Sequence, residues 1–384
     1  MKLKQKKWVK NLSAQRGISL VELMVSVVIG LVVIAGALQV VFSSKREFLD
    51  QNELQFIQTN SRYALELLRN DLLMAGYMGC ATGSAIDVAN TLNNDANGFA
   101  SLNGLMGYDG DAVAGVAAYP AAYSGDALNG TDTLLVRYAN PRESLEVQSH
   151  NPYIAQLTMW DEPDFAAGST MVITESNCRA VSLFQVSAVN GNRIDHKVDA
   201  SADTHNCTNV LRGDINCGMT NCTVDSPDSC GTYSNLSQGF NAGSQVMPLV
   251  SHAYYVGPST VMPGLNALKR EVLNSNGEPT TAPEEIALGV DDFEVSYGVD
   301  SDFDGSVDQY LDAEAVALLD IDGDGLADPE EVWEQVRSVK LSLVLRSQSP
   351  VFGADQTKTL AGTDYTDRFF RSQVNSTIMI RNRG

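Results

Sequence analysis

Two acidic segments of this 384-residue chain have the residue types and spacing of cation-binding loops. Carboxylates at loop positions 1, 3 and 5, with a glycine at position 6 that turns the backbone, can converge on one Ca²⁺ ion. We call residues 300–312 the first acidic loop and residues 320–331 the second. The candidate ligands are Asp300, Asp302, Asp304 and Asp308 in the first loop, and Asp320, Asp322, Asp324, Asp328 and Glu331 in the second.

The two loops differ in how complete their ligand sets are. The second loop has Glu331 at position 12, where an EF-hand loop carries its bidentate glutamate. The first has Leu311 at that position and Asp312 one residue later, so its last ligand stays open. A solvated acidic turn is the alternative for both, since Asp and Gly are common turn residues. We expect Ca²⁺ at residues 320–331 in a structural role, although Pro329 interrupts an exit helix, and we leave residues 300–312 open between the two interpretations.

A third residue with chemical potential is Glu22, which lies inside an apolar run. Residues 18–42 form 25 residues with this single charge, long enough for a membrane-spanning helix. A carboxylate in a bilayer costs roughly 2.5–3.5 kcal/mol on insertion scales and usually has a partner. A cleaved secretory signal has a shorter apolar run, and a plain signal anchor gives no reason for the acid. The basic residues before the run predict that everything after Phe42 is exported.

The elements that follow predict an α+β fold. Residues 43–79 are free of proline and have apolar residues at helical spacing, so an amphipathic helix should continue from the membrane segment and end near Gly76 and Gly79. Residues 80 to about 123 suggest a long irregular connection. Strands are expected at residues 133–138, 180–189, 252–256, 293–299, 336–346 and 374–380. Because no βαβ alternation appears, we expect an antiparallel sheet packed against the long helix, within an exported β-rich domain at residues 80–384.

The six cysteines favour disulfides in an oxidising compartment, because the count is even and no CxxC pair occurs. Six cysteines allow 15 connectivities. Within the Cys-rich segment (residues 178–230), short loops would pair the last four cysteines, residues 207 to 230, among themselves. Cys80 would then pair with Cys178. The candidates are Cys80, Cys178, Cys207, Cys217, Cys222 and Cys230.

The N-terminal region resembles the processing site of type IV pilins and type II secretion pseudopilins. The string Gly17-Ile18-Ser19-Leu20-Val21-Glu22 follows a leader with six basic residues and no acid. The resemblance implies that prepilin peptidase cuts the leader (residues 1–17) after Gly17 and that the new N-terminal residue, Ile18, is methylated. Phenylalanine is commoner than isoleucine at that place in the family. The resemblance also implies that Glu22 of one subunit pairs with the amine of a neighbour during assembly.

The order of later segments is similar to that of PilW-type minor pilins over most of the chain. The similar pieces are RNDLLMAGYMGC, DTLLVRY, VRSVKLSLVLRS and DRFFRSQVNSTIMIRNRG. This resemblance implies a non-catalytic minor pilin that helps prime type IV pilus assembly, with adhesion at the tip as a further role. Its expected partners are other minor and major pilins and prepilin peptidase. Its expected location is the bacterial inner membrane before assembly and the pilus afterwards.

Composition and motifs argue against two other classes of protein. The net charge is −21, and the chain after residue 17 holds 47 acidic against 20 basic residues, so no nucleic-acid partner is expected. The four histidines (His150, His196, His205 and His252) form no HExxH pair, and no GxSxG or GxxxxGK[ST] motif occurs. A type II secretion minor pseudopilin and a membrane-anchored calcium-dependent adhesin or binding module remain the alternatives.

Overall fold

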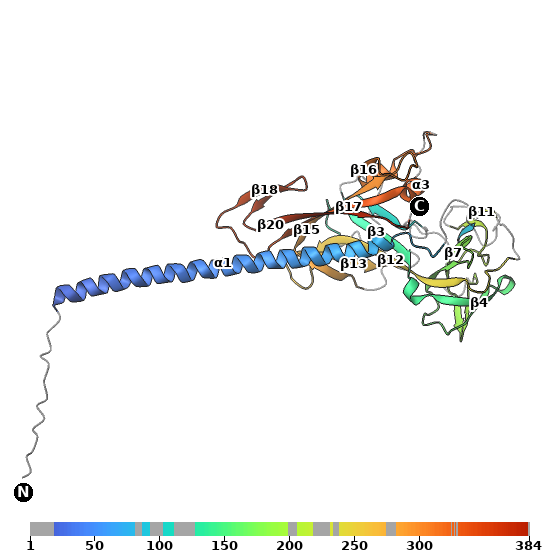
Figure 1. Cartoon of the computed structure of the whole chain (residues 1–384), viewed down its shortest axis with the longest axis horizontal. Coiled ribbons are helices and arrows are strands. Elements are labelled where there is room, and N and C mark those ends of the chain that lie inside the picture. The colour runs from blue at the N-terminus through green and yellow to red at the C-terminus, as the bar shows by residue number, and fades with distance from the viewer. Residues whose placement is uncertain are drawn as a thin grey trace, which may run out of the picture. The chain divides into compact units, whose positions relative to one another are not determined.

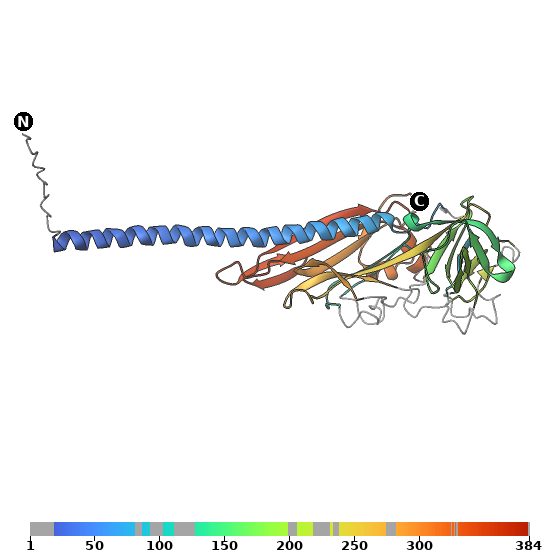
Figure 2. The ribbon, with the colours of Figure 1, turned by 90° about the horizontal axis from the view of Figure 1, so that it is seen from below.

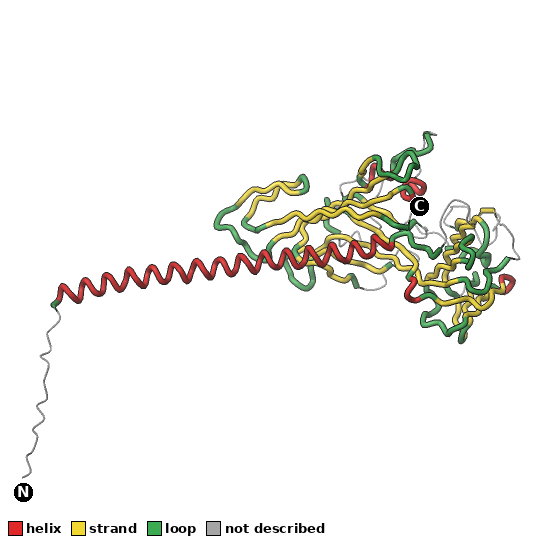
Figure 3. The backbone as a smooth tube through the Cα atoms, in the orientation of Figure 1, coloured by secondary structure: helices red, strands yellow, loops and turns green. Residues whose placement is uncertain are grey.

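The computed structural model describes residues 19–80, 87–92, 103–110, 127–198, 206–217, 231–232, 238–273, 282–323, 325, 327 and 329–382. The chain divides into two compact units, Met1–Leu54 and Gln55–Gly384. Figures 1 and 3 show one long helix, α1, while strands dominate the second unit. The leader, Gly17 and Ile18 lie outside the described residues.

Helix α1 (Leu20–Met74) carries two different surfaces along its 55 residues. Its first part is strongly apolar and buries none of its apolar stretch, and α1 is the one described helix long and apolar enough to cross a membrane. The part within the second unit buries Ile57, Ala64, Leu68 and Leu72. These residues recur at the three- and four-residue spacing of one helix face, so this part packs as an amphipathic helix.

Helix α1 ends where the sequence predicted. Gly76 has a φ of +75°, a left-handed conformation that favours glycine, and its N–H donates to the Arg137 carbonyl at 3.0 Å. Gly104 packs against this turn: a Cβ there would lie 2.0 Å from the Gly76 nitrogen. The end of the helix is thereby fixed to the sheet by backbone contacts that tolerate no side chain at residue 104.

The described residues of the second unit form three sheets, with short helices between some of the strands. The strands are β1 (Asp87–Asn90), β2 (Leu105–Tyr108), β3 (Thr133–Ala139), β4 (Leu145–Asn151), β5 (Gln156–Met159), β6 (Thr170–Thr174), β7 (Ala180–Gln185), β8 (Ala188–Asn190), β9 (Arg193–Asp195), β10 (Asp214–Asn216), β11 (Gly231–Thr232), β12 (Gln245–Pro258), β13 (Asn266–Val272), β14 (Glu284–Leu288), β15 (Val290–Val299), β16 (Gln309–Leu311), β17 (Val336–Arg346), β18 (Gln356–Leu360), β19 (Thr363–Asp367) and β20 (Arg371–Met379). The short helices are η1 (Pro141–Glu143), η2 (Pro152–Ile154), α2 (Ala313–Ala317) and α3 (Pro329–Glu334).

The C-terminal sheet has the order β16-β15-β17-β20, with every pair antiparallel. Strand β17 alternates so that Leu341, Leu343 and Leu345 enter the main core, which also holds the buried residues of α1. Burying each leucine stabilises the fold by roughly 1.5–3 kcal/mol. The strands expected at residues 293–299, 336–346 and 374–380 are β15, β17 and β20. Their buried apolar residues pack with those of the later part of α1, which runs alongside these strands in Figure 2.

The larger sheet includes strand β12, which is long enough to serve two parts of the unit. Its first residues pair with β4 and β6, and its later residues pair with β3 and β13. The β4–β9 region has its own core, which includes Val147, Leu157, Ile173 and Phe184. The strand expected at residues 133–138 is β3, and the strand expected at residues 252–256 lies within β12.

Three expectations about this sheet need correction. The connection at residues 80–123 is not wholly irregular, because it contains β1 and β2. The strand expected at residues 180–189 is two strands, β7 and β8. The sheets are mostly antiparallel, but β1 pairs in parallel with both β7 and β10. A disulfide joins Cys80, which precedes β1 in the chain, to Cys178, which lies two residues before β7.

The disulfide between Cys80 and Cys178 is the pairing that the sequence left for them, with Cα atoms 5.2 Å apart. Cys207 and Cys217 form the second disulfide, also one of the short-loop pairings. Cys222 and Cys230 lie outside the described residues. The first bridge closes a 98-residue separation and ties the segment after α1 to the turn before β7.

Candidate functional site: the N-terminal helix and the acidic loops

Glu22 lies in the first turn of α1, and its side chain is exposed. Its backbone N–H donates to the Ser19 hydroxyl at 3.1 Å, and the Ser26 hydroxyl donates to its carbonyl at 2.7 Å. A negative charge near a helix N-terminus is favourable because backbone N–H groups there lack partners. Within the described part of the chain, no ion pair includes Glu22, so its carboxylate is available to a group from another molecule.

The surface around Glu22 is apolar and continuous. The residues on either side of it, Val21 and Leu23, are exposed, as are most large apolar side chains up to Phe42. In water such a surface would be strongly unfavourable, since each large apolar side chain left exposed forgoes roughly 1.5–3 kcal/mol. The first part of α1 therefore requires a bilayer or other helices around it.

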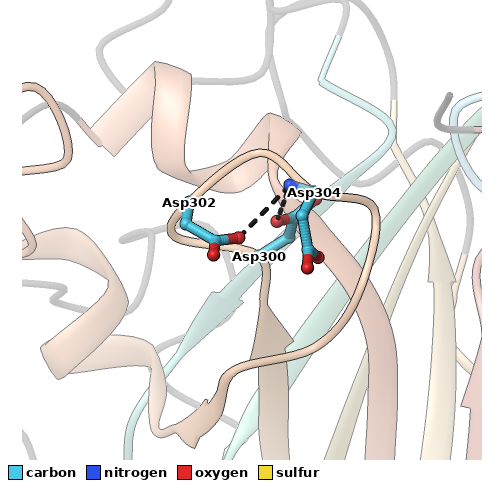
Figure 4. Close-up of side chains that lie close together, drawn as sticks. All are labelled: Asp300, Asp302 and Asp304. Atoms are coloured by element: carbon cyan, nitrogen blue, oxygen red, sulfur yellow. Dashed lines mark hydrogen bonds between the residues drawn. The ribbon is translucent and has the colours of Figure 1, made fainter.

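The first acidic loop joins β15 to β16 and gathers three of its four candidate ligands. Carboxylate oxygens of Asp300, Asp302 and Asp304 lie within 4.8 Å of one another (Figure 4), the one such group among the described residues. The backbone N–H of Gly305 donates to Asp300 Oδ2 at 2.9 Å. Asp308 is not part of the group, because its Oδ2 accepts hydrogen bonds from the backbone and hydroxyl of Ser301.

The Asp300 carboxylate is already partly neutralised. It is fully buried, and Arg337 of β17 donates from Nε to its Oδ2 at 3.0 Å. Asp302 and Asp304 are exposed. Because calcium takes six to eight oxygen ligands, these two side chains, one oxygen of Asp300 and water would have to complete the coordination. Asp312 is not a further ligand here, because its carboxylate caps α2 by accepting from the Ala315 N–H at 2.7 Å.

The second acidic loop repeats the backbone turn of the first. Asp320 Oδ2 accepts from the Gly325 N–H at 2.9 Å, the same five-residue spacing as Asp300 and Gly305. Both glycines have φ near +90°. The described carboxylates of this loop, Asp320, Asp322 and Glu331, are not gathered as the first group is. Asp324 and Asp328 lie outside the described residues.

Both loops are followed by a short helix, which the sequence interpretation missed. Helix α2 follows the first loop, and α3 begins at Pro329 directly after the second. Pro329 was expected to interrupt the exit, but proline is compatible with the first helical turn, where its missing N–H costs nothing. The segment between β15 and β17 therefore carries two acidic turns that begin 20 residues apart, each with a short helix after it, and β16 lies between the first turn and α2.

The histidines that the structure describes belong to packed regions. His150 Nδ1 accepts from the Phe240 N–H at 3.0 Å, so its Nε2 carries the proton, and that atom lies 3.0 Å from His196 Nε2. Burial lowers the pKa of His150 to about 4, with Arg212 adding to the effect. His252 lies instead beside Asp71 of α1. His205 lies outside the described residues.

A group of buried and half-buried acids was not anticipated from the sequence: Asp132, which directly precedes β3, and Asp292 and Glu294 of β15. Burial raises the pKa of Asp132 to about 7 despite hydrogen bonds from the Gly110 and Val295 N–H groups. Burial, then the charges of Asp132 and Asp292, raise the pKa of Glu294 to about 9. The alternation of β15 brings Asp292 and Glu294 to one face, but strand alternation alone does not reveal that Asp132, directly before β3, lies near them.

Two family models match this chain, one near its N-terminus and one over its C-terminal third. Residues 253–382 match the family model described as type IV pilus-assembly protein W, PilW. Residues 12–38 match the model of the prokaryotic N-terminal methylation motif. The chain has no match among curated proteins or among solved structures. The first match covers β13 to β20 with part of β12, and so includes both acidic loops and the C-terminal sheet.

These two matches point to a structural, non-enzymatic subunit that is anchored in a membrane by its N-terminal helix and works with other components of the pilus. The two matches are consistent with a PilW-like, class III prepilin-like protein, and they support a role of the type IV pilus minor pilin type.

Proposed function

We propose that this protein is a minor pilin that is cut by prepilin peptidase between Gly17 and Ile18, methylated at Ile18, and then assembled into a type IV pilus. The observation that carries the proposal is Glu22, an exposed carboxylate on a continuously apolar helix with no ion pair among the described residues. An acid in that position is costly in a bilayer unless a cation joins it.

The cut itself supplies that cation. Cleavage before Ile18 creates a positive amine four residues from Glu22, and the amine of one subunit can pair with Glu22 of its neighbour. Pairing relieves the cost of keeping either charge alone in an apolar environment. Helices would then add in a fixed register, because a shift of one subunit along another separates the two charges.

The size of the second unit favours a role at low copy near the pilus tip. Residues 55–384 form one compact unit, which would be the bulky head of the subunit outside the membrane. Such a head packs poorly in a repeating shaft, so we place the protein in a priming complex with other minor pilins and with the first major pilin. The match to PilW favours the pilus over a type II secretion pseudopilus.

The assembly role is tested by Glu22→Ala in the native host, with Glu47→Ala as the matched control. Glu47 is an exposed acid on the same helix beyond the apolar run. We expect both variants to reach the membrane at the wild-type level, and only Glu22→Ala to lower the number of pili, by about tenfold or more. Wild-type piliation with Glu22→Ala would remove the proposed pairing.

We also propose that the acidic loops bind Ca²⁺ in a structural role, which could in turn regulate assembly or adhesion. The supporting observation is the shared turn, in which Gly305 and Gly325 each donate to the first aspartate of their loop. Both turns leave further carboxylates exposed in the same loop. Without an ion, clustered carboxylates repel one another, so the ion would hold each loop–helix segment against β17.

A further inference from the structure

The β6–β7 turn carries a polar pocket that the assembly role does not use. The pocket has a volume of about 630 Å³ and is lined by residues from four separate chain segments. Its base is formed by Glu175, which follows β6, and Arg212, which precedes β10; Asp87, Asn177, Arg179 and Asn241 are among the residues around them. The volume falls within the range of about 300–1,000 Å³ that is typical of small-molecule sites.

The base of the pocket is a fixed network of charges. Arg212 Nη1 lies 2.7 Å from Glu175 Oε1, and its Nη2 lies 3.2 Å from Asp87 Oδ2. Asn241 donates to the same Glu175 oxygen at 2.9 Å. The Arg212 guanidinium also stacks over the Phe240 ring, 5.4 Å from its centroid. These contacts hold both charged groups in one geometry.

Burial makes this network costly. Glu175 is 3% exposed and Arg212 is 8% exposed, and taking two such charges out of water costs several kcal/mol per ion in general. Glu175 Oε2 and Arg212 Nε have no hydrogen-bond partner among the described residues. Most buried polar atoms in proteins are satisfied, so two such atoms in one pair call for an explanation.

The turn above the base is rigid. The disulfide between Cys80 and Cys178 fixes one side of it, and Cys178 N–H donates to the Glu175 carbonyl at 2.8 Å. Asn177 accepts from the Arg179 N–H at 3.0 Å. The pocket is therefore shaped before any ligand arrives, which lowers the entropic cost of binding.

The lining selects the chemical class of the ligand. Every lining residue that the structure describes is polar or glycine, so these residues offer no matching surface to an acyl chain or an apolar peptide side chain. Two acids, Asp87 and Glu175, balance two arginines, and both acids are paired with Arg212. A metal ion would compete with the Arg212 guanidinium for both carboxylates, and a polyanion would meet acids beside the arginines.

A neutral ligand rich in hydroxyl groups meets these conditions. Each hydroxyl both donates and accepts, as the amides of Asn177 and Asn241 do, while a guanidinium donates and a carboxylate accepts. We propose that this pocket binds a short neutral saccharide, with Asn177, Arg179 and Asn241 contacting its hydroxyls. This binding is separate from pilus assembly and does not depend on Glu22.

The test is saturation-transfer NMR on the full chain in a zwitterionic detergent that contains no sugar. The probes are glucose, galactose, mannose, N-acetylglucosamine and N-acetylgalactosamine, with N-acetylneuraminic acid as the charged comparison. We expect at least one neutral sugar to bind, and Asn177→Ala and Asn241→Ala each to weaken that binding by about tenfold, the effect of losing a contact worth about 1.4 kcal/mol. Asn375→Ala, an exposed amide on β20, should bind as the wild type does.

Three results would overturn the proposal. They are no binding of the five neutral sugars, binding of the charged sugar alone, and equal binding by both pocket variants and the wild type. Thermal melting of each variant separates loss of the site from loss of the fold. Both pocket variants should also form pili normally, because the pocket is separate from the assembly surface at Glu22. A failure of the saccharide proposal would therefore not count against the assembly proposal.

Discussion

Asp71 of α1 and His252 of β12 lie 2.6 Å apart, carboxylate Oδ2 to imidazole Nδ1. The Tyr254 hydroxyl donates to the same oxygen at 2.5 Å, and the Tyr138 hydroxyl donates to Oδ1 at 3.2 Å. Asp71 is one of the few polar residues on the buried face of the helix. This network gives the contact between helix and sheet a specific register, which the surrounding leucines alone would not fix.

Replacing Asp71 by alanine should destabilise the second unit by about 1–3 kcal/mol, the cost of leaving a buried polar partner unsatisfied. The partner at risk is the Tyr254 hydroxyl, because Tyr254 is fully buried. Urea unfolding of the full chain, followed by tyrosine and tryptophan fluorescence, measures the change. Glu66→Ala, an exposed acid on the same helix, should stay within about 0.5 kcal/mol of the wild type. Equal effects from the two substitutions would mean that the network does not stabilise the fold.

The buried acids predict that the second unit is less stable in alkali than in mild acid. The pKa of Glu294 is raised from 4.5 to about 9, so the folded state binds more protons than the unfolded state between those values. Stability therefore falls as pH rises through this window. Glu294→Gln removes the titrating group, and its melting temperature at pH 8 should exceed that of the wild type by on the order of 2 °C or more.

The matched control for this pH dependence is Glu162→Gln, which alters an exposed acid in the loop after β5. Its melting temperature should follow the wild-type curve from pH 5 to pH 8. If Glu294→Gln also followed that curve, the proposed titration of Glu294 would be wrong.

Asp71 contributes to the pH dependence of stability in the opposite direction: burial acts to raise its pKa, but hydrogen bonds from His252 and Tyr254 lower it overall. Its stabilisation is present above the ordinary aspartate pKa and is lost as pH falls below it.

Calcium should raise the melting temperature of the full chain, with EGTA reversing the effect. Calorimetry should give a dissociation constant on the order of 10⁻⁴–10⁻³ M or tighter, the range of extracellular calcium modules. Asp302→Asn and Asp320→Asn each alter one loop, and each should remove one site. Asp302 is the better choice in the first loop, because Asp300 also pairs with Arg337 and its loss would disturb β17.

Asp355→Asn supplies the control for general charge effects, since Asp355 is exposed and lies outside both loops. It should bind calcium as the wild type does. A calcium role for these loops would be contradicted if calorimetry detected no heat of calcium binding to the wild type. It would also be contradicted if both loop variants bound calcium as the wild type does. A response to magnesium equal to that to calcium would indicate charge screening rather than a defined site.

The fold was predictable where one residue pattern decides one element. Apolar residues at helical spacing predicted the amphipathic part of α1: Leu54, Ile57, Ala64, Leu65, Leu68, Leu72 and Ala75. The structure buries all of them except Leu54, which is exposed, and Leu65, which is half-buried. The alternation in residues 336–346 predicted β17 with its observed bounds. Short strands such as β1 were missed because four residues carry too little pattern. The parallel pairing of β1 with β7 joins residues more than 90 positions apart, which no local pattern predicts.

The sites divide in the same way. Glu22 stood out as a candidate because one charge in an apolar run has no structural reason, and the acidic loops stood out as calcium candidates because their acids are close in sequence. The pocket at Glu175 and Arg212 and the pairing of Asp71 with His252 join residues that are far apart in the chain. No local pattern marks them, since an isolated acid on a helix or after a strand is common on protein surfaces.

The most direct test of the central claim is the mass and N-terminal sequence of the mature protein isolated from its native membrane. A chain that starts at Ile18 and carries one added methyl group would agree with processing by prepilin peptidase and with assembly through Glu22. A chain that keeps Met1 and the leader, or one cut after Phe42, would contradict the account. In either of those cases no amine would form four residues from Glu22, and the proposed pairing between neighbouring subunits could not occur.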